Sequence, residues 1–328
     1  MTVNLYSDTQ TRPTEGMRRA MAEAEVGDEQ RGLDPTVTRL QERVAELLGH
    51  ERGLFLPSGT MCNAIAFRLH LRPGGDEVVL DHTAHPIVAE AGGPAAISGA
   101  MLAEVDGDGG RFTAEQLEAA IRPPDRYLPR TRLVSVEQTT NLAGGRVWPL
   151  EQVDAVVATA RAHGLRAHLD GARLMNAAVA SGVEARRYAA GFDTAWLDFS
   201  KGLGAPVGAV LCGSGDLIEE AWRFKQMWGG ALRQAGVLAA GCLYALDHHV
   251  DRLAEDHENA KVLAAGLGLD EPDTNIVIAE VPDAGEVKAR LIEHGVEASV
   301  IAPGRIRFVT HLDVDRAGVE QAVRAFAA

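Results

Sequence analysis

The sequence predicts an α/β protein with a mostly parallel sheet, helices on both faces of that sheet, and a small C-terminal α+β domain. Its 328 residues exceed what one hydrophobic core usually holds, about 250–300 residues, so we expect a large domain and an appendage. Apolar strands alternate with helical patterns, which favours a sheet covered on both faces. A plausible hinge at 266–272 divides the chain. We therefore expect a large domain over 1–266, with an N-terminal arm over 1–33, and a small domain over 267–328.

The first elements of the large domain have clear boundary signals. A helix is expected over 34–48, because Asp34 can cap it, Pro35 fits its first turn and Gly49 can end it. A short apolar strand at 53–56 then leads into a helix over 61–71.

The remaining elements follow from apolar runs and helical spacing. A helix is expected over 150–163 and one long helix from 234 to about 265. The small domain should contain helices at 286–293 and 317–326. The expected strands are 77–80, 132–137, 166–170, 194–199 and 207–212 in the large domain, and 275–280 and 305–309 in the small one.

Composition excludes several classes of protein. The chain carries 46 acidic and 32 basic side chains, a net charge of −14, which argues against a nucleic-acid or anionic-membrane surface. Its longest uncharged run, 53–67, is too short and too polar to span a bilayer. The first twelve residues lack a signal core, and three widely spaced cysteines resemble reduced thiols rather than a disulfide frame or zinc site. We expect a cytoplasmic protein without a metal.

Lysine is scarce, which narrows the search for a reactive amine. The chain has 28 Arg and only four Lys, at positions 201, 225, 261 and 288. Lys201 directly follows a predicted strand, in a loop with three glycines and a proline. An amine held at a strand end, away from bulk water, is suited to Schiff-base chemistry. The alternative is that Lys201 caps its loop or pairs with an acid.

Asp170 ends the predicted strand that lies one crossover connection before Lys201. Both side chains should emerge at the carboxyl edge of neighbouring strands, where open α/β sheets bind ligands. A buried carboxylate needs a partner, and a pyridinium nitrogen kept cationic by this aspartate would be one. The alternative is that Asp170 caps the following turn.

Two further segments could bind parts of a cofactor. Ser58, Gly59 and Thr60 lie between a strand and a helix, where backbone N–H groups and hydroxyls can hold a phosphate, although the same residues also form ordinary helix caps. His85 follows another strand and is a candidate for stacking on a planar ring, or else a satisfied polar residue. His248 and His249 occupy adjacent helical positions that face different directions, so they predict no metal pair.

With these residues present, the chain resembles pyridoxal-phosphate enzymes of the aspartate-aminotransferase fold, and most closely the L-threonine aldolases. The resemblance extends almost end to end and rests on motifs in the same order. They are SDTQTRPTEGMRRAMAEAEVGDE at 7–29, DPTV at 34–37, LPSGTMCN at 56–63, EAGG at 90–93, HLDGARLMNAAVASG at 168–182, SKGLGAPVGAVL at 200–211, GGALRQAGVLAAGCLYAL at 229–246 and RIRFVTHLDVD at 305–315.

The resemblance implies roles for the residues already singled out. Lys201 would carry pyridoxal 5′-phosphate, Asp170 would pair with its ring nitrogen, Gly59 and Thr60, with Ser58, would hold its phosphate, and His85 would stack on its ring. The family's positions that bind the substrate carboxylate correspond to Ser7, Arg173 and Arg307. Of these, Arg173 would also lie near the cofactor's phenolic oxygen. Arg233 matches a cofactor-binding position that neighbouring subunits contribute, which implies a homodimer or homotetramer with active sites at the subunit interfaces.

The chain also departs from the family pattern. Tyr6 replaces an arginine, Arg31 stands where a tyrosine is usual near the substrate entrance, and Thr140 replaces a histidine placed beside the substrate hydroxyl. A lysine expected on the neighbour's loop appears as Gln226, with Lys225 one residue earlier on a loop expected to contact the neighbouring subunit. These changes concern the substrate side chain and the base, rather than the cofactor.

The implied reaction is cleavage of a β-hydroxy-α-amino acid, such as L-threonine or L-allo-threonine, to glycine and an aldehyde. The side chain of Thr140 has no useful acidity or basicity near neutral pH, so it cannot be the base. We therefore expect His85, or a water ordered by it, to act as the base. Alternatives on the same scaffold are β-elimination, transamination, or cleavage of another substrate such as phenylserine. A protein that holds the cofactor without turnover is disfavoured by Arg173 and Arg307, and a dehydrogenase by the absence of an early G-x-G-x-x-G turn.

Overall fold

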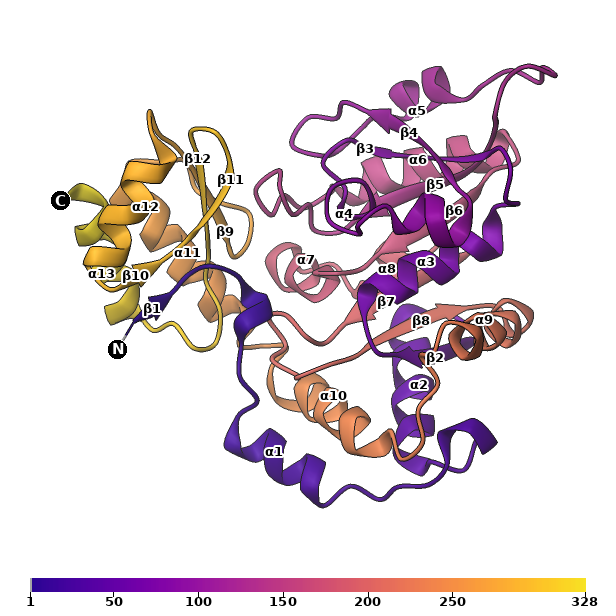
Figure 1. Cartoon of the computed structure of the whole chain (residues 1–328), viewed down its shortest axis with the longest axis horizontal. Coiled ribbons are helices and arrows are strands. Elements are labelled where there is room, and N and C mark those ends of the chain that lie inside the picture. Colours follow the sequence, from indigo (N-terminus) through magenta and orange to yellow (C-terminus); the bar gives the residue numbers. More distant parts are fainter. Residues whose placement is uncertain (1) are drawn as a thin grey trace.

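The computed structural model describes residues 2–328, which form a large lobe and a C-terminal lobe (Figure 1). The large lobe is built on a seven-stranded sheet. In spatial order its strands are β2 (Arg52–Leu56), β8 (Ala209–Gly213), β7 (Thr194–Asp198), β6 (Arg166–Asp170), β5 (Arg130–Glu137), β3 (Asp76–Asp81) and β4 (Met101–Val105). The strands from β7 to β4 are parallel, and β8 is antiparallel to both of its neighbours. The predicted, mostly parallel sheet is confirmed.

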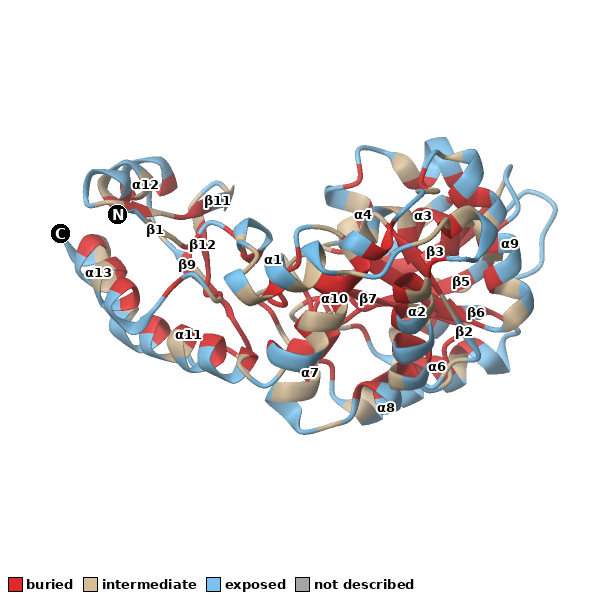
Figure 2. Cartoon of the chain, turned by 90° about the horizontal axis from the view of Figure 1, so that it is seen from below, coloured by how far each residue is buried: buried red, intermediate tan, exposed pale blue. Residues whose placement is uncertain are grey.

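Helices cover both faces of the sheet, as predicted. One face packs against α2 (Pro35–Leu48), α5 (Ala114–Ala120), α6 (Leu150–Ala162), α7 (Leu174–Ser181), α8 (Ala185–Ala189) and α10 (Gly236–His248). The other packs against α3 (Gly59–His70), α4 (His85–Val88), the π-helical η3 (Pro94–Ser98) and α9 (Gly215–Met227). Figure 2 shows buried residues concentrated along the strands and on the inner faces of these helices.

The C-terminal lobe is a three-stranded antiparallel sheet with helices packed against it. Its strands are β11 (Ser299–Ala302), β12 (Arg305–Val309) and β9 (Ile276–Glu280), in that order, and its helices are α11 (Leu253–Leu267), α12 (Ala284–Glu293) and α13 (Arg316–Ala327). The N-terminal strand β1 (Val3–Asn4) pairs in parallel with β10 (Val296–Glu297), so the chain begins against this lobe (Figure 1). The side chain of Leu5, which follows β1, packs with side chains of α11 in the hydrophobic core of the C-terminal lobe. The division at residues 266 and 267 stays a prediction.

The N-terminal arm carries three short helices before α2. They are η1 (Asp8–Gln10), α1 (Glu15–Ala22) and η2 (Glu29–Arg31). Helix α1 packs against α10, which places the arm along the large lobe (Figure 1). Ser7 lies just before η1, between β1 in the C-terminal lobe and the rest of the arm.

Some local features of the structure differ from what the sequence led us to expect. The single helix expected from 234 to about 265 is two helices, because the chain turns at His249, whose buried ring bonds to the carbonyl of Leu203 at 2.7 Å. Helix α9 was not expected, and β4 was missed because it is a short edge strand in which only Val105 is buried and Glu104 interrupts the apolar residues. Between residues 2 and 328, none of the helices has the length and apolar character needed to cross a membrane.

Candidate active site

The carboxyl ends of three parallel strands bring acidic residues together at one edge of the sheet. Glu137 ends β5, Asp170 ends β6, and Asp198 ends β7. Glu137 and Asp170 are direct partners in the strand register. Lys201 follows β7 by three residues, and its Nζ lies 3.1 Å from Asp198 Oδ2. The alternative that Lys201 pairs with an acid is therefore correct for the protein alone, and the pair lies where ligands bind open α/β sheets.

The loop after β7 holds Lys201 in place through its backbone. The N–H of Gly204 donates to the Lys201 carbonyl at 2.9 Å, and Gly204 has a φ of 75°, which favours glycine. The hydroxyl of Thr11, in the N-terminal arm, donates to the same carbonyl at 2.9 Å. The side chain of Lys201 is 18% exposed. The amine is thus sheltered, yet reachable.

Asp170 is buried and is held by two N–H donors. Asn63 Nδ2 donates to Oδ2 at 2.8 Å, and the Ala172 backbone donates to Oδ1 at 3.1 Å. Burial raises the pKa of Asp170, while the bond from Asn63 and the charges of His85 and Lys201 oppose that rise. A cation placed against this carboxylate would further favour its ionised form.

The start of α3 is the segment at which an anion cradle was predicted. Ser58 caps the helix, its Oγ accepting from the Met61 N–H at 3.2 Å, which leaves the first N–H groups of the helix without a partner inside it. Thr60 is exposed. A Cβ on Gly59 would lie 2.2 Å from the ring of Trp196, so only glycine fits there. Because β2 runs parallel to β7, this cradle lies at the same sheet edge as Lys201.

His85 begins α4 and faces a buried acid. Its Nδ1 lies 2.9 Å from Glu90 Oε1, and its side chain is 30% exposed while that of Glu90 is 1% exposed. Within the described residues, Nε2 of His85 has no hydrogen-bond partner. A ring fixed on one side and open on the other fits either stacking or proton transfer.

The two arginines expected at a substrate carboxylate have different partners. Arg173 makes a bidentate pair with Asp8, with Nε to Oδ2 at 2.8 Å and Nη2 to Oδ1 at 2.6 Å. Burial would raise the pKa of Asp8, but Arg173 outweighs it and holds this pKa well below its usual range. Most of the charge of Arg173 is therefore already satisfied.

Arg307, in contrast, contacts only neutral oxygens. It donates to Asn141 Oδ1 at 2.6 Å, to Ser299 Oγ at 3.3 Å and to the Tyr6 carbonyl at 3.4 Å. It is 8% exposed, and burial, followed by the charge of Arg173, lowers its pKa. A buried guanidinium without an acidic partner among residues 2–328 is suited to a ligand carboxylate.

Ser7 and Thr140 are buried beside these groups and also serve the local backbone. Ser7 Oγ accepts from the Thr9 N–H at 3.2 Å and from the Thr9 hydroxyl at 2.9 Å. Thr140 Oγ1 accepts from the Arg146 N–H at 3.0 Å, which fixes the loop after β5. Each hydroxyl keeps one proton to donate.

Arg31 and Arg233 lie elsewhere on the subunit. Both are exposed, and Arg233 pairs with Asp28 at 3.3 Å beside η2. Arg31 lines a cavity of about 460 Å³ between η2, α2, β2 and α9. Neither contacts Lys201 or Asp170 within one chain, so their roles at a neighbour's site stay predictions. The loop position expected for Lys225 is wrong, because Lys225 lies within α9, fully buried and paired with Glu29.

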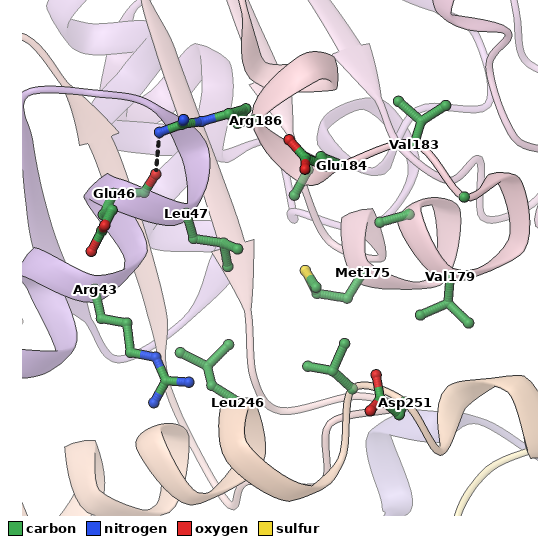
Figure 3. Close-up of a pocket in the computed structure, with 14 residues that line it drawn as sticks. Arg43, Glu46, Leu47, Met175, Val179, Val183, Glu184, Arg186, Leu246 and Asp251 are labelled. Atoms are coloured by element: carbon green, nitrogen blue, oxygen red, sulfur yellow. Dashed lines mark hydrogen bonds between the residues drawn. The ribbon is translucent and has the colours of Figure 1, made fainter.

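The most apolar of the described cavities shares no lining residue with the predicted site. It has a volume of about 660 Å³ and lies between α2, α7, α8 and α10. Leu47, Met175 and Leu246 extend into it, and Arg186 closes one side by bonding to the Glu46 carbonyl at 3.1 Å (Figure 3). This cavity is therefore separate from the strand ends that carry Lys201 and Asp170.

Comparison with known proteins assigns the chain to a family. The family model described as "Beta-eliminating lyase" matches residues 4–283. The chain belongs to the beta-eliminating lyase family. It is 40% identical over 341 residues to the probable low-specificity L-threonine aldolase 2 of Arabidopsis thaliana, covering 99% of this chain and 96% of that one. It is also 40% identical over 322 residues to the low specificity L-threonine aldolase of Escherichia coli (strain K12), covering 96% and 95%.

A solved structure agrees with the fold of this family. The threonine aldolase of Leishmania major matches with a TM-score of 0.85 at 21% identity, covering 99% of this chain and 98% of that one. This confirms the expected threonine-aldolase fold of the pyridoxal-phosphate enzymes. The chain is accordingly a carbon–carbon lyase of the aldehyde-lyase kind.

Several buried residues of the chain received no role from the sequence. They are Asp8, Asn63, Glu90, Glu137 and Asp198, each of which contacts or adjoins a predicted site residue. Asp8, Asn63 and Glu90 lie inside segments quoted for the resemblance. Glu137 lies three residues before Thr140, and Asp198 lies three residues before Lys201. Polar residues inside a motif were the available signal, but only the fold reveals which of them meet.

Proposed function

We propose that this protein is a pyridoxal-phosphate-dependent aldolase that cleaves L-threonine or a similar β-hydroxy-α-amino acid to glycine and an aldehyde. One observation carries the proposal: Lys201 and Asp170 emerge from neighbouring parallel strands at the edge where the α3 cradle also opens. The two low-specificity L-threonine aldolases that are 40% identical along nearly the whole chain support the same reaction.

The residues present fit pyridoxal phosphate. The phosphate would lie at the start of α3, where it would accept hydrogen bonds from the N–H groups of Gly59 and Thr60 and lie near the hydroxyls of Ser58 and Thr60. Asp170 offers a buried carboxylate to the ring nitrogen, and Lys201 offers a sheltered amine. When bound, the cofactor draws off the electrons released as the Cα–Cβ bond of the substrate breaks.

The chain's own groups bind and orient the amino acid. Arg307 would receive the substrate carboxylate, because it is buried and lacks an acidic partner. Ser7 would add a hydroxyl contact, and Arg173, held by Asp8, would face the phenolic oxygen with the nitrogen that Asp8 leaves free. Asp170 would keep a proton on the ring nitrogen by stabilising its positive charge.

His85 is the group that would take the proton of the β-hydroxyl. Its Nδ1 is held by Glu90, which leaves Nε2 to accept a proton directly or through water. Thr140 would orient the hydroxyl without acting as a base, and Arg31, from a neighbouring subunit, would contact the substrate side chain. After the bond breaks, the aldehyde leaves and Cα is reprotonated to give glycine.

The assembly would be a homodimer or homotetramer, in which Arg233 of one subunit supports the cofactor of the next. The exposure of Arg233, and its pairing with Asp28 rather than with a residue of the candidate site in its own chain, support this arrangement. The enzyme would act in the cytoplasm. The acidic surface supports a small-molecule substrate rather than nucleic acid.

A product assay tests the proposed reaction. The reconstituted enzyme is incubated separately with L-threonine, L-allo-threonine, L-serine and phenylserine, and glycine, aldehyde, 2-oxo acid and ammonia are each measured. Equal amounts of glycine and aldehyde are expected from the threonine isomers. The competing activity is β-elimination, which the description of the matched family favours. Ammonia and a 2-oxo acid without glycine would establish elimination instead.

A further inference from the structure

Asn63 lies at the centre of a buried hydrogen-bond network behind the candidate site. It belongs to α3, is 1% exposed, and bonds to four side chains. Its Nδ2 lies 2.8 Å from Asp170 Oδ2 and 2.8 Å from Glu90 Oε1. Its Oδ1 lies 2.8 Å from Trp196 Nε1 and 3.1 Å from His168 Nε2. The amide thus uses two donors and two acceptor sites, which is its full capacity.

The partners of Asn63 fix which way its amide points. An indole N–H can only donate, so the atom facing Trp196 must be the amide oxygen, and the NH₂ group must face the two carboxylates. His168 must then donate from Nε2, which makes its Nδ1 the acceptor for the Thr194 hydroxyl at 2.8 Å. Thr194 Oγ1 in turn accepts from His70 Nε2 at 3.0 Å.

Both histidines in this network are held neutral, which keeps the pattern in one state. Burial lowers the pKa of His168 to about 3 and that of His70 to about 4. A neutral imidazole has one donor and one acceptor, as the network requires. The amide of Asn63 is therefore locked at physiological pH, and both of its N–H bonds are committed to the carboxylates.

The two carboxylates that Asn63 holds serve different parts of the site. Asp170 faces the proposed position of the cofactor ring nitrogen. Glu90 Oε1 accepts from both Asn63 and His85 Nδ1, so it fixes the imidazole ring. The ring of Trp196 also packs against Gly59 in the phosphate cradle. A single amide therefore connects the group beneath the ring nitrogen, the proposed base and the wall of the cradle.

We propose that Asn63 is a positioning residue that fixes the carboxylate of Asp170 and, through Glu90, the imidazole of His85. This inference rests on the proposed function, because it takes Asp170 and His85 as the groups that meet the cofactor. Neither the sequence motifs nor the similarity to threonine aldolases assigns this role to Asn63. Its effect on catalysis would be indirect, since it would touch neither cofactor nor substrate.

The charges around Asp170 determine what losing Asn63 would do. Glu90 faces Asp170 with negative charge, while His85 and Lys201 face it as bases that carry positive charge when protonated. Glu137 also lies beside Asp170, and burial, followed by the charge of Asp170, raises its own pKa. Asn63 is the side chain that donates a hydrogen bond to the carboxylate. Without this donor, the effects of burial and of the Glu90 charge on the pKa of Asp170 would no longer be opposed by Asn63, and Asp170 would take up a proton at higher pH.

The test measures cofactor affinity of the full-length apoprotein over a range of pH, using pyridoxal phosphate itself as the probe. We expect Asn63→Ala to weaken binding about 10- to 100-fold at neutral pH, the usual cost of a hydrogen bond to a charged group. Affinity should fall as Asp170 is protonated, and the midpoint of that fall should move up by about one pH unit in the variant. Should alanine prevent folding, the isosteric Asn63→Asp keeps the acceptors for Trp196 and His168 and should shift the midpoint in the same direction.

Thr194→Val is the matched control. Thr194 is equally buried and lies in the same network, but it contacts neither Asp170 nor Glu90. This variant should lose thermal stability yet keep cofactor affinity within about twofold and the pH midpoint unchanged. A role for Asn63 in stability alone would give both variants the same behaviour.

The outcomes separate this proposal from the proposed function. Wild-type protein that fails to bind pyridoxal phosphate would contradict both. Wild-type protein that binds it, together with a folded Asn63→Ala or Asn63→Asp variant of wild-type affinity and pH midpoint, would overturn the role of Asn63 alone. Equal losses in the asparagine variants and in Thr194→Val would also overturn it.

Discussion

Two lysines of this protein each face a carboxylate, and only one of them has access to a ligand. Lys201 lies 3.1 Å from Asp198 in the loop after β7, with 18% of its side chain exposed. Lys225 pairs with Glu29 inside the lobe and is fully buried. Its amine also lies 4.8 Å from the ring centre of Trp222. The sequence alone offered both as positions of interest, and the structure separates them.

The difference lies in what surrounds each ion pair. Burial lowers the pKa of Lys225, and Glu29 opposes that change, while the other oxygen of Glu29 accepts from the Leu232 N–H at 2.8 Å. That pair joins η2, α9 and the following loop, which is a structural role. Lys201 instead opens towards Asp170 and the α3 cradle. A sheltered lysine becomes a candidate for chemistry only where a ligand can reach it and an electron sink can be held beside it.

The largest expected effect comes from removing the accessible lysine. Lys201→Ala should lower threonine cleavage on the order of 10³-fold or more and abolish the visible absorption of bound pyridoxal phosphate, because no other amine lies at the sheet edge. Lys225→Met should keep the visible band. Both variants are measured by absorption spectra and by aldehyde release, and a retained band in Lys201→Ala would remove the distinction between the two lysines.

The next effect should fall on stability rather than on chemistry. Lys225→Met leaves Glu29 buried without its partner, which should lower the free energy of unfolding by about 3–5 kcal/mol. Replacing both residues, as Lys225→Met with Glu29→Leu, should recover much of this loss, because no uncompensated charge remains. Urea unfolding of the apoproteins measures both. A single variant as stable as wild type would show that the pair does not hold the arm to α9.

Arg307 tests whether the site of the accessible Lys201 also binds the substrate carboxylate. Arg307→Gln keeps a side chain that can bond to Asn141 but removes the charge. It should raise KM for threonine about 10- to 100-fold, since a charge-assisted contact is lost, and should leave cofactor affinity unchanged. Steady-state kinetics and cofactor titration check the two parts. An unchanged KM would place the substrate carboxylate elsewhere.

Mild acid should loosen the Lys201 side of the lobe, where two neutral histidines are buried. The pKa of His168 is about 3 and that of His70 about 4, below the value near 6.5 of an unfolded histidine. Between these values the unfolded chain binds more protons than the folded chain. The free energy of unfolding therefore decreases as the pH falls from about 6.5 towards these values. The loss should be about 1 kcal/mol per pH unit for each histidine. Urea unfolding at pH 7 and pH 5 measures it, and His168→Gln should reduce the difference.

The smallest effect on the isolated chain should come from Arg233. It is 64% exposed and pairs with Asp28 at the surface, so Arg233→Ala should change the stability of one subunit by less than about 0.5 kcal/mol. If neighbouring subunits share sites, cofactor affinity of the assembled enzyme should nevertheless fall. Sedimentation and cofactor titration are compared, and unchanged affinity in an assembled variant would contradict a shared site.

The sheet and most of its helices were predictable because their signals are local. Asp34, Pro35 and Gly49 marked α2 at both ends, and apolar runs marked strands such as β6 and β7. Edge strand β4 was not predictable, because its partial exposure leaves a weaker apolar pattern. The turn at His249 was not predictable either, because a single buried hydrogen bond to the Leu203 carbonyl leaves no pattern in the sequence.

The candidate site was predictable to a similar degree. Lys201, Asp170 and the Ser58–Thr60 turn follow strand ends, and strand ends meet at one sheet edge. The pairing of Arg173 with Asp8 and the four bonds of Asn63 depend on segments far apart in the chain. Burial and hydrogen-bond partners of this kind arise only when these distant segments come together in the fold.

Chemical trapping tests directly whether Lys201 is the residue that carries pyridoxal phosphate. The reconstituted enzyme is reduced with borohydride, digested and analysed by mass spectrometry. With four lysines in the chain, each candidate can be followed on its own peptide. We expect a phosphopyridoxyl group on Lys201 and none on Lys225, Lys261 or Lys288. An unmodified Lys201 peptide, or a modification on one of the other three lysines, would contradict it.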